Sequence, residues 1–225
     1  MQRRAVLFDL FHTLTAVEAV PGNGGPGTSE ILGVSREAWN AQLLGHSRDR
    51  LTGVVRDPVE IVRRMARAID PSIPEEAIRA AAARRAERFA RALLEPPAET
   101  LEMLRSLRGP LGLVSNADAS EAAAWPRSPL APLFASAVFS CDAGAAKPDP
   151  EIYLACVRAL GVRADECVFV GDGGSDEMAG AKRLGMATVL YRGLARRIWP
   201  DRAPASAPAA DVVVDELGGL REAVE

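Results

Sequence analysis

Two short apolar segments, far apart in the chain, each end on an aspartate. AVLFDL carries Asp9 and ECVFVGD carries Asp172, and both have the length and composition of a buried strand. Further strand-like segments, such as LGLVSN, SAVFS and ATVLY, alternate with helix-like ones, such as PEIYLACVRALG and DEMAGAKRLG. Repeated units of this kind predict an α/β fold, a three-layer Rossmann-like parallel sheet with helices on both faces. Open sheets of this class bind their ligands at the carboxyl ends of the strands.

A long helical stretch separates the first strand from the rest of the predicted sheet. Residues 16–27 are too rich in glycine and proline for regular structure. Residues 29–94 have apolar positions every three to four residues and contain no convincing strand. Asp57 followed by Pro58 is typical of a helix N-cap and first turn.

This stretch predicts two domains. Residues 1–15 and 98–225 form the α/β core, and residues 16–97 form a helical cap domain over the carboxyl edge of the sheet. Within the core, residues 192–210 are polar and rich in proline and alanine, and we predict a connection there without a regular element.

The composition excludes several classes of function. The chain has 225 residues and a formal net charge of −3, so it lacks the basic footprint of a nucleic-acid-binding protein. No apolar run approaches the length of a membrane span, and the three cysteines show neither metal-site nor disulfide spacing. We therefore expect a cytoplasmic protein, in a reducing compartment, with no nucleic-acid or membrane partner.

A hydroxyl, an amide and a lysine follow two of the inner strands. Ser115 and Asn116 end the strand LGLVSN, where a hydroxyl and free amides can hold phosphate oxygens. Serine and asparagine also favour ordinary turns. Lys147, one of only two lysines in the chain, lies in the turn AAKPDP, which its proline keeps extended before the next helix. A lysine in that position is hard to explain as an ordinary surface residue.

Carboxylates gather at the other strand ends. Asp9 follows the first strand, and Asp172 is followed by two glycines, which free the backbone to approach a ligand, and by Asp176 and Glu177. Each acid alone also fits a turn or a helix start. Together with the hydroxyl and the lysine, they predict a site for a small anionic electrophile. Mg²⁺ and the lysine would neutralise charge around a carboxylate nucleophile.

The order of these motifs resembles the haloacid dehalogenase (HAD) superfamily of hydrolases. The matching elements are Asp9 with Thr13, then Ser115, then Lys147 in KPDP, then GD followed by acids and AGAKRLGM. The resemblance covers the whole predicted core, and the helical insert resembles the cap that this superfamily places between its first two motifs.

The resemblance implies a role for each matching residue. Asp9 would be the nucleophile that forms a covalent intermediate, and Lys147 would pair with it and with the negative charge of the substrate. Thr13 and Ser115 would hold the transferring group, and the substrate site would also include Asn116, Phe11 and His12. The implied Mg²⁺ ligands are Asp9, the backbone carbonyl of Phe11, Asp172, Asp176 and Glu177, with Glu177 where the family more often has its second aspartate.

The chain departs from the family at positions 11 and 12. Phosphatases of this family carry an aspartate at position 11, which protonates the leaving alkoxide and then activates water. Phe11 can do neither, and loss of a general acid typically removes about 10²–10⁴ in rate. His12 replaces the usual glycine and could supply a proton near neutral pH. If strand alternation continues to this position, however, its side chain points away from the substrate.

Several functions remain open. The first is a Mg²⁺-dependent phosphatase that acts on a small phosphorylated metabolite through an aspartyl-phosphate on Asp9. The second is a 2-haloacid dehalogenase, whose branch has an aromatic residue at position 11 and needs no Mg²⁺, so that the intact GDGGSDE segment argues against it. A phosphonate-cleaving enzyme would need a lysine in the cap, and residues 15–98 contain none. A phospho-ligand sensor that has lost turnover is the non-enzymatic alternative.

Substrate choice in the superfamily lies in the cap, where the sequence says least. Polar and aromatic residues on or near the first cap helices could face the site: Arg36, Trp39, His46, Arg48 and Arg50. Arginines on such helices are more often solvated.

Overall fold

The computed structural model describes residues 4–45, 47–201 and 208–224. These residues form a six-stranded parallel sheet in the order β3-β2-β1-β4-β5-β6. The strands are β1 Ala5–Phe8, β2 Leu111–Ser115, β3 Ser136–Phe139, β4 Cys167–Gly171, β5 Ala187–Tyr191 and β6 Val212–Val214. The chain runs outward from the central β1 through β2 and β3, and later outward on the other side through β4 to β6. The carboxyl ends of β1, β2 and β4 therefore meet where such sheets bind ligands, and the predicted α/β fold is confirmed.

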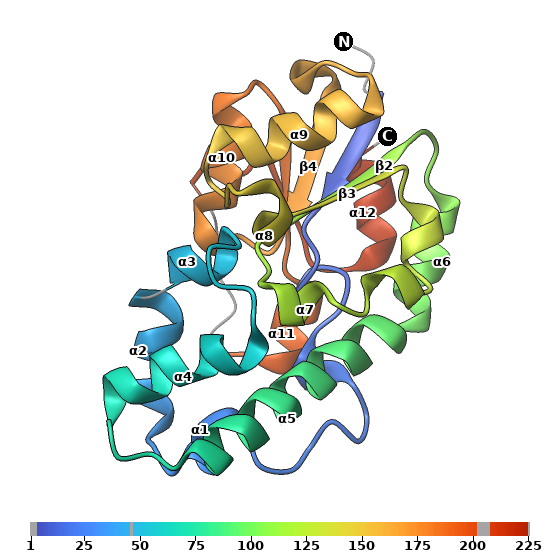
Figure 1. Cartoon of the computed structure of the whole chain (residues 1–225). Helices are drawn as coiled ribbons and strands as arrows, with labels where there is room; N and C mark the ends of the chain where they lie inside the picture. Colours follow the sequence, from blue (N-terminus) through green and yellow to red (C-terminus); the bar gives the residue numbers. More distant parts are fainter. Residues whose placement is uncertain (1–3, 46, 202–207, 225) are drawn as a thin grey trace.

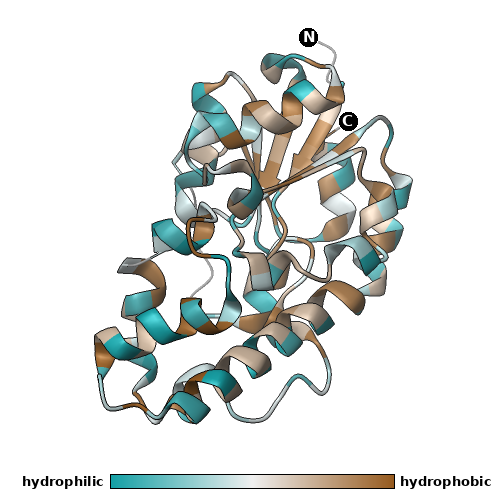
Figure 2. Cartoon of the chain, viewed as in Figure 1, coloured by the Kyte–Doolittle hydropathy of each residue, from teal (hydrophilic) through white to brown (hydrophobic). Residues whose placement is uncertain are grey.

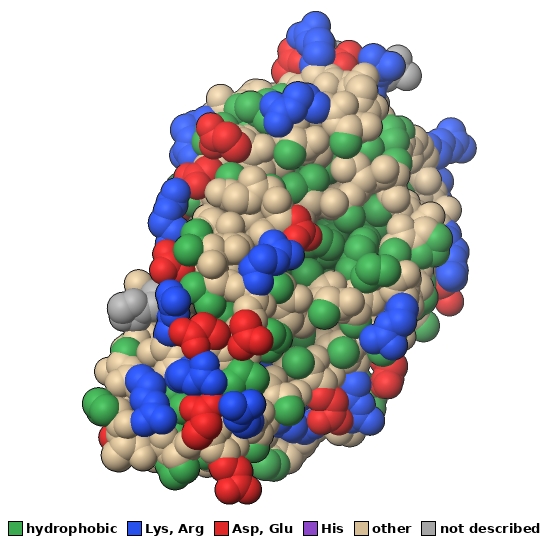
Figure 3. Space-filling model, viewed as in Figure 1, with side chains coloured by type: hydrophobic (Ala, Val, Ile, Leu, Met, Phe, Trp, Pro, Cys, Tyr) green, Lys and Arg blue, Asp and Glu red, His purple; other side chains and the backbone are tan. Residues whose placement is uncertain are grey.

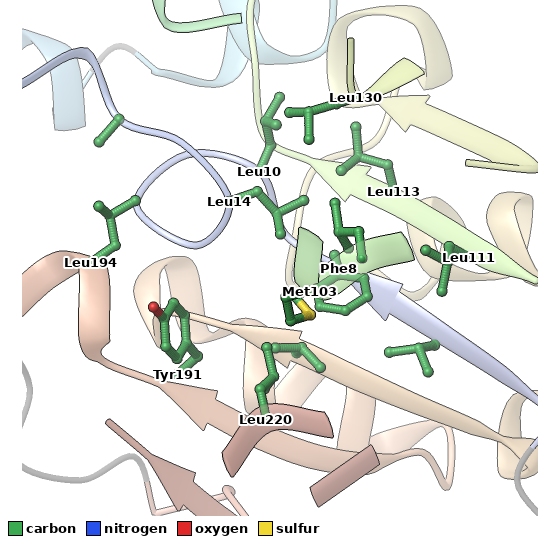
Figure 4. Packing of buried hydrophobic residues seen from close by; sticks show 14 of the residues in the cluster. Phe8, Leu10, Leu14, Met103, Leu111, Leu113, Leu130, Tyr191, Leu194 and Leu220 are labelled. Carbon is green, nitrogen blue, oxygen red and sulfur yellow. The ribbon is translucent and has the colours of Figure 1, made fainter. Parts of the chain in front are cut away.

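Helices cover both faces of the sheet (Figure 1). They are α6 Ala98–Ser106 and α12 Leu217–Val224 on one face, and α9 Pro150–Leu160 and α10 Glu177–Arg183 on the other. Successive residues of β1 alternate between the two layers, so that Val6 and Phe8 pack with Met103 and Leu220 (Figure 4), whereas Leu7 packs on the opposite side. Burial on both faces explains why the strands read as continuous apolar runs, which stand out as hydrophobic in Figure 2. The three cysteines are free and buried, as expected.

The described residues between β1 and β2 form helices but no strand, as the sequence predicted. The helices of this insert (residues 16–97) are α1 Thr28–Leu32, α2 Arg36–Gly45, α3 Ser47–Leu51, α4 Pro58–Ile69 and α5 Glu75–Leu94. They lie beyond the carboxyl ends of the strands (Figure 1) and share a separate buried cluster that includes Trp39 and Ile61. Asp57 caps α4, accepting a hydrogen bond from the backbone nitrogen of Glu60 at 2.7 Å. Within the described ranges, no helix has the length and apolar character needed to cross a membrane.

The prediction of an irregular connection over residues 192–210 is wrong in part. Helix α11, Gly193–Ile198, follows β5 directly, and Leu194 packs into the same apolar layer as Tyr191 (Figure 4). The arginines and proline in this segment hid the short apolar contact that holds the helix to the core. Residues 202–207 of the same segment lie outside the described residues. Two more short helices, α7 Ala119–Ala122 and α8 Ser140–Ala143, directly follow β2 and β3.

Gly53, between α3 and α4, lies where the insert meets α8. Its φ is +74°, and a Cβ here would lie 2.0 Å from the carbonyl oxygen of Cys141. We expect Gly53→Ala to lower the free energy of unfolding by about 1–3 kcal/mol, because alanine is strained in left-handed backbone and the contact must open. Urea denaturation measures this effect. The matched control is Gly33→Ala, since Gly33 has a similar φ of +68° and a Cβ there meets nothing within 4 Å. Equal stabilities of the two variants would contradict the contact.

Candidate active site

Asp9 lies at the centre of the sheet edge, immediately after β1, and is buried. The hydrogen bond from its backbone nitrogen to the Val170 carbonyl, 2.8 Å, continues the pairing of β1 with β4. Each side-chain oxygen of Asp9 has a separate donor. The hydroxyl of Thr13 donates to Oδ2 at 2.9 Å, and Nζ of Lys147 donates to Oδ1. The carboxylate is thereby held in one orientation at the point where a ligand is expected.

Lys147 reaches Asp9 from the loop between α8 and α9. Its buried ammonium group also donates to Oε2 of Glu177 at 2.6 Å. Burial disfavours the charge, but Asp9 and Glu177 raise the pKa of Lys147 above that of an ordinary lysine. The side chain of Asn116 binds the backbone of Lys147 twice, through Nδ2 to the carbonyl oxygen at 3.0 Å and from the backbone nitrogen to Oδ1 at 2.7 Å. The Asn116 side chain therefore helps to position this lysine. The substrate contact expected of Asn116 stays a prediction.

Three carboxyl groups converge beside the lysine. Among the described residues, one oxygen each from Asp9, Asp172 and Glu177 lies within 4.8 Å of the others. Asp172 follows β4, and Glu177 begins α10, where its Oε1 accepts a hydrogen bond from Gly173 at 2.9 Å. Gly171 leaves room for this carboxylate, since a Cβ there would lie 2.0 Å from Oε1.

Burial and repulsion act on these carboxyl groups. Burial raises the pKa of Glu177 to about 8, aided by the charges of Asp9 and Asp172, although Lys147 opposes the shift. Burial, followed by the charge of Asp9, also raises the pKa of Asp172. A single ammonium group thus faces three acids, and a divalent cation would relieve the remaining repulsion. Because carboxylate oxygens are preferred by hard cations, the residues present fit Mg²⁺.

Asp176 is exposed and lies outside this group of acids. Its backbone is left-handed, with φ of +50°, as is that of Ser175 before it. The sequence analysis expected both Asp176 and Glu177 to complete or orient the metal shell. Only Glu177 shares the buried space with Asp9. A metal-ligand role for the backbone carbonyl of Phe11 stays a prediction.

Ser115 ends β2 next to Asp9 and is buried. Its hydroxyl oxygen has no hydrogen-bond partner within the described part of the chain. A buried hydroxyl left without a partner costs about 1–3 kcal/mol. An oxygen of a bound ligand would satisfy it, which supports the role expected of this residue in holding the transferring group.

Phe11 is turned toward the insert. Its ring meets that of Phe89, on α5, edge to face with centroids 5.0 Å apart. The guanidinium group of Arg85 lies over the other ring of the pair, 4.9 Å from the centroid of Phe89. The position where phosphatases of the resembling family carry an acid therefore makes an apolar contact between core and insert.

His12 does not follow the strand alternation that the sequence analysis assumed. β1 ends at Phe8, and His12 lies in a turn with φ of +66°. Its ring lies tilted against that of Trp199, with centroids 4.7 Å apart, and Nε2 is 3.3 Å from Oε2 of Glu18. Burial opposes a charge on this ring, yet Glu18 raises the pKa of His12 on balance. Neither Glu18 nor Trp199 carried a sequence signal for this contact.

The insert residues that the sequence analysis expected near the site lie in different surroundings. Trp39 is buried in the insert's own cluster, whereas Arg36 and Arg48 are exposed. His46 lies outside the described residues. Arg50 faces the core and binds Asp118. Arg85, which the sequence analysis missed, binds the same acid from α5.

An open cleft of about 740 Å³ lies at the junction between insert and core. Its walls come from the two segments that join the insert to the core and from the end of α11, and they include Thr15, Glu18, Pro21, Glu95, Pro97 and Trp199. Asp9 and Lys147 do not line it. This cleft is therefore distinct from the group of carboxylates around Lys147.

Comparison with known proteins yields relatives of two kinds. A glyceraldehyde 3-phosphate phosphatase of Methanopyrus kandleri (strain AV19) is 36% identical over 96 residues, which are 41% of this chain and 40% of that protein. The chain thus spans less than half the length of this curated relative. The structure of L-2-haloacid dehalogenase from Xanthobacter autotrophicus with chloropropionic acid covalently bound matches with a TM-score of 0.65, at 21% identity over 98% of each chain. A HAD phosphatase from Thermococcus onnurineus matches with a TM-score of 0.61, at 24% identity over 98% of this chain and 97% of that one.

The two solved structures are distant enough in sequence to show the fold alone. The family assignment comes from a model described as haloacid dehalogenase-like hydrolase, which matches residues 3–185. That span includes Asp9, Ser115, Lys147 and Asp172, the residues on which the resemblance was based. The chain belongs to the haloacid dehalogenase-like hydrolases.

Proposed function

We propose that this hydrolase is a Mg²⁺-dependent phosphatase that acts on a small phosphorylated metabolite through an aspartyl-phosphate on Asp9. The observation that carries the proposal is the buried carboxylate of Asp9, held by Thr13 and Lys147 beside two further acids. Sequence similarity to the Methanopyrus relative, which is called a glyceraldehyde 3-phosphate phosphatase, also supports it.

In the first step, Asp9 attacks the phosphorus atom. An oxygen–phosphorus bond forms to the carboxylate while the ester bond breaks and the leaving oxygen takes its electrons. Lys147 keeps Asp9 ionised before the attack and offsets the negative charge of the phosphoryl oxygens. Thr13 fixes the orientation of the carboxylate, and the unpartnered hydroxyl of Ser115 would donate to a phosphoryl oxygen.

Asp9, Asp172 and Glu177 are the side chains that would hold Mg²⁺. When bound, the ion would supply positive charge against the phosphoryl oxygens. In the absence of substrate, Lys147 already bridges Asp9 and Glu177, so the same carboxylates serve the lysine and would serve the ion.

Phe11 restricts the choice of substrate. The phenyl side chain of Phe11 can neither protonate the leaving oxygen nor activate the water that hydrolyses aspartyl-phosphate. Substrates whose leaving group needs no proton, such as acyl phosphates, therefore suit this site best, and the second step limits turnover.

The runner-up function is that of a 2-haloacid dehalogenase. The edge-to-face pair of Phe11 and Phe89 favours it, because halide departs unprotonated and an apolar wall suits it. The partly buried Asp172 and the buried Glu177 argue against it, because dehalogenation has no need of a metal.

We further propose that the insert acts as a cap domain, residues 16–97, over a core of residues 1–15 and 98–225.

A substrate screen with and without Mg²⁺ tests the proposal. We expect phosphate release from acetyl phosphate and aryl phosphates that requires Mg²⁺ and stops when EDTA is added. Asp172→Asn should raise the Mg²⁺ concentration needed for half-maximal rate by at least tenfold, since a charged ligand is lost. Asp165→Asn, in the exposed turn before β4, is the matched control.

Other outcomes identify the alternatives. Halide release from 2-haloacids without Mg²⁺ would establish the dehalogenase. Metal-dependent binding of phosphorylated compounds, with no product from any of the three substrate classes, would establish a phospho-ligand sensor. Asp176→Asn, measured in the same assay, tests whether this exposed carboxylate contributes to Mg²⁺ binding, as the sequence analysis expected.

A further inference from the structure

Two arginines of the insert are buried against two acids of the core. Nη2 of Arg85 lies 3.0 Å from Oδ2 of Asp118 and also binds Glu121. Nη1 of Arg50 lies 3.3 Å from the same oxygen of Asp118 and 3.7 Å from Glu121. All four side chains are between 0% and 12% exposed. Two positive and two negative charges thus balance across the junction between insert and core.

These four residues differ from the other ion pairs at the junction. Arg56 binds Asp142 at 2.6 Å and Arg48 lies 3.7 Å from Asp149, but these pairs are largely exposed. On the face seen in Figure 3, positive and negative side chains likewise intermingle over the insert. Exposed pairs contribute little to stability. Removing one partner of a buried group, in contrast, leaves an uncompensated charge away from water.

The buried acids are also part of the strand-end turn that carries Ser115. Asp118 is the N-cap of α7, and together with Glu121 it forms a capping box with the backbone of that helix. Nη1 of Arg85 donates to the hydroxyl of Ser120 at 2.9 Å as well. Arg85 therefore binds the turn that begins three residues after Ser115, at Asp118.

Arg85 is linked to the turn after Asp9 through Phe89. Its guanidinium group lies over Phe89, whose ring contacts Phe11, two residues after Asp9. Two neighbouring side chains of α5, Arg85 and Phe89, thus connect the turn after β2 with the turn after β1. Asp9 itself is only 6% exposed in this arrangement.

We propose that Arg50 and Arg85 latch the insert onto the core through Asp118 and Glu121, and that Arg85 is a positioning residue for the turns that carry Ser115 and Phe11. The latch encloses Asp9 before substrate arrives, so substrate entry requires these pairs to separate. The latch does not depend on the proposed phosphatase activity, because its contacts lie within the chain itself.

Hydrogen exchange read by mass spectrometry tests the latch on the full chain without substrate. In Arg85→Gln, we expect residues 52–56 and 116–122 to exchange roughly tenfold faster or more, since a buried charge pair is broken. The matched control is Arg79→Gln on the same helix, where the Arg79 side chain is 65% exposed and pairs with Glu75 of the insert. Exchange equal to that of the control overturns the latch.

Arg85→Gln leaves two buried carboxylates with one cation, so a second set of variants covers loss of folding. Glu121→Gln and the double variant Arg85→Gln/Glu121→Gln complete a cycle. The double variant should exchange more slowly than the product of the two single effects predicts, because each change removes the same interaction. If the effects of the two single variants on the exchange rate multiply in the double variant, the interaction between Arg85 and Glu121 is overturned.

Kinetics with acetyl phosphate separate positioning from general destabilisation. Arg85→Gln should lower kcat more than it raises KM, because the variant closes poorly around bound substrate, and Arg85→Lys should recover part of kcat. Unchanged kcat in a folded variant contradicts the positioning role. If the wild type releases no phosphate, the proposed function fails, while the exchange data still decide the latch.

Discussion

Asp9→Asn is expected to abolish turnover of every substrate that the wild type hydrolyses. An amide cannot form the covalent intermediate, and loss of a nucleophile typically lowers kcat by about 10⁴–10⁶-fold. Intact-mass measurement during turnover of acetyl phosphate should show the wild type gaining one phosphoryl group and the variant gaining none. Peptide mapping should place that group on Asp9.

The variant is expected to stay folded, which makes the result interpretable. Lys147 keeps Glu177 as a partner, and removing one of three neighbouring carboxylates relieves repulsion in the buried cluster. Circular dichroism and a cooperative thermal transition check this point. A folded Asp9→Asn protein with turnover close to that of the wild type would remove Asp9 from the mechanism, whatever the substrate.

Phe11→Asp is expected to create a better phosphatase toward esters with poor leaving groups. An aspartate here could protonate the departing alkoxide, and the gain should be at best about 10²–10⁴-fold in kcat for alkyl phosphates. Aryl phosphates should gain less in the first step and still gain in the second, where water attacks aspartyl-phosphate. The wild type should accordingly give a burst of product, and the burst should disappear in the variant.

Phe11→Asn is the matched control, since it loses the contact with Phe89 without adding an acid. A gain shared by both variants would show that loosening the insert, not proton transfer, limits the rate. His12→Gly tests the competing donor and suits the left-handed backbone at that position. If His12 supplies the proton, the wild type turns over alkyl phosphates well and His12→Gly abolishes this. In a dehalogenase, Phe11→Asp would instead damage halide release by charging an apolar pocket.

The strands were readable from the sequence because parallel strands covered on both faces are apolar at every position. Once AVLF and CVFVG were placed in one sheet, the strand-end rule brought Asp9, Ser115 and Asp172 to the same edge. Lys147 was identifiable because lysine is so rare in this chain. Backbone hydrogen bonding and apolar burial, the strongest organising forces, act through patterns that a sequence displays.

What sequence reasoning missed depends on partners that no local pattern specifies. Alternation failed at His12 because β1 ends four residues earlier, at Phe8, and the turn that follows has its own geometry. Asparagine at position 116 offers a donor and an acceptor, but its pairing with the backbone of Lys147 spans 31 residues. Arg85 and Asp118 lie 33 residues apart, and on α5 this arginine looks like any other solvated one.

The two ends of the insert meet at one place. Thr15, just after the Asp9 turn, donates a hydrogen bond at 2.6 Å to the carbonyl oxygen of Ala92, near the end of α5. Asn23 likewise binds the carbonyl oxygen of Arg88, so that the departing and returning segments run as neighbours. A module attached in this way is exchangeable: evolution or an engineer can replace it with another of any size without lengthening or redirecting the chain that builds the sheet. The same sheet edge could thereby be combined with different inserts.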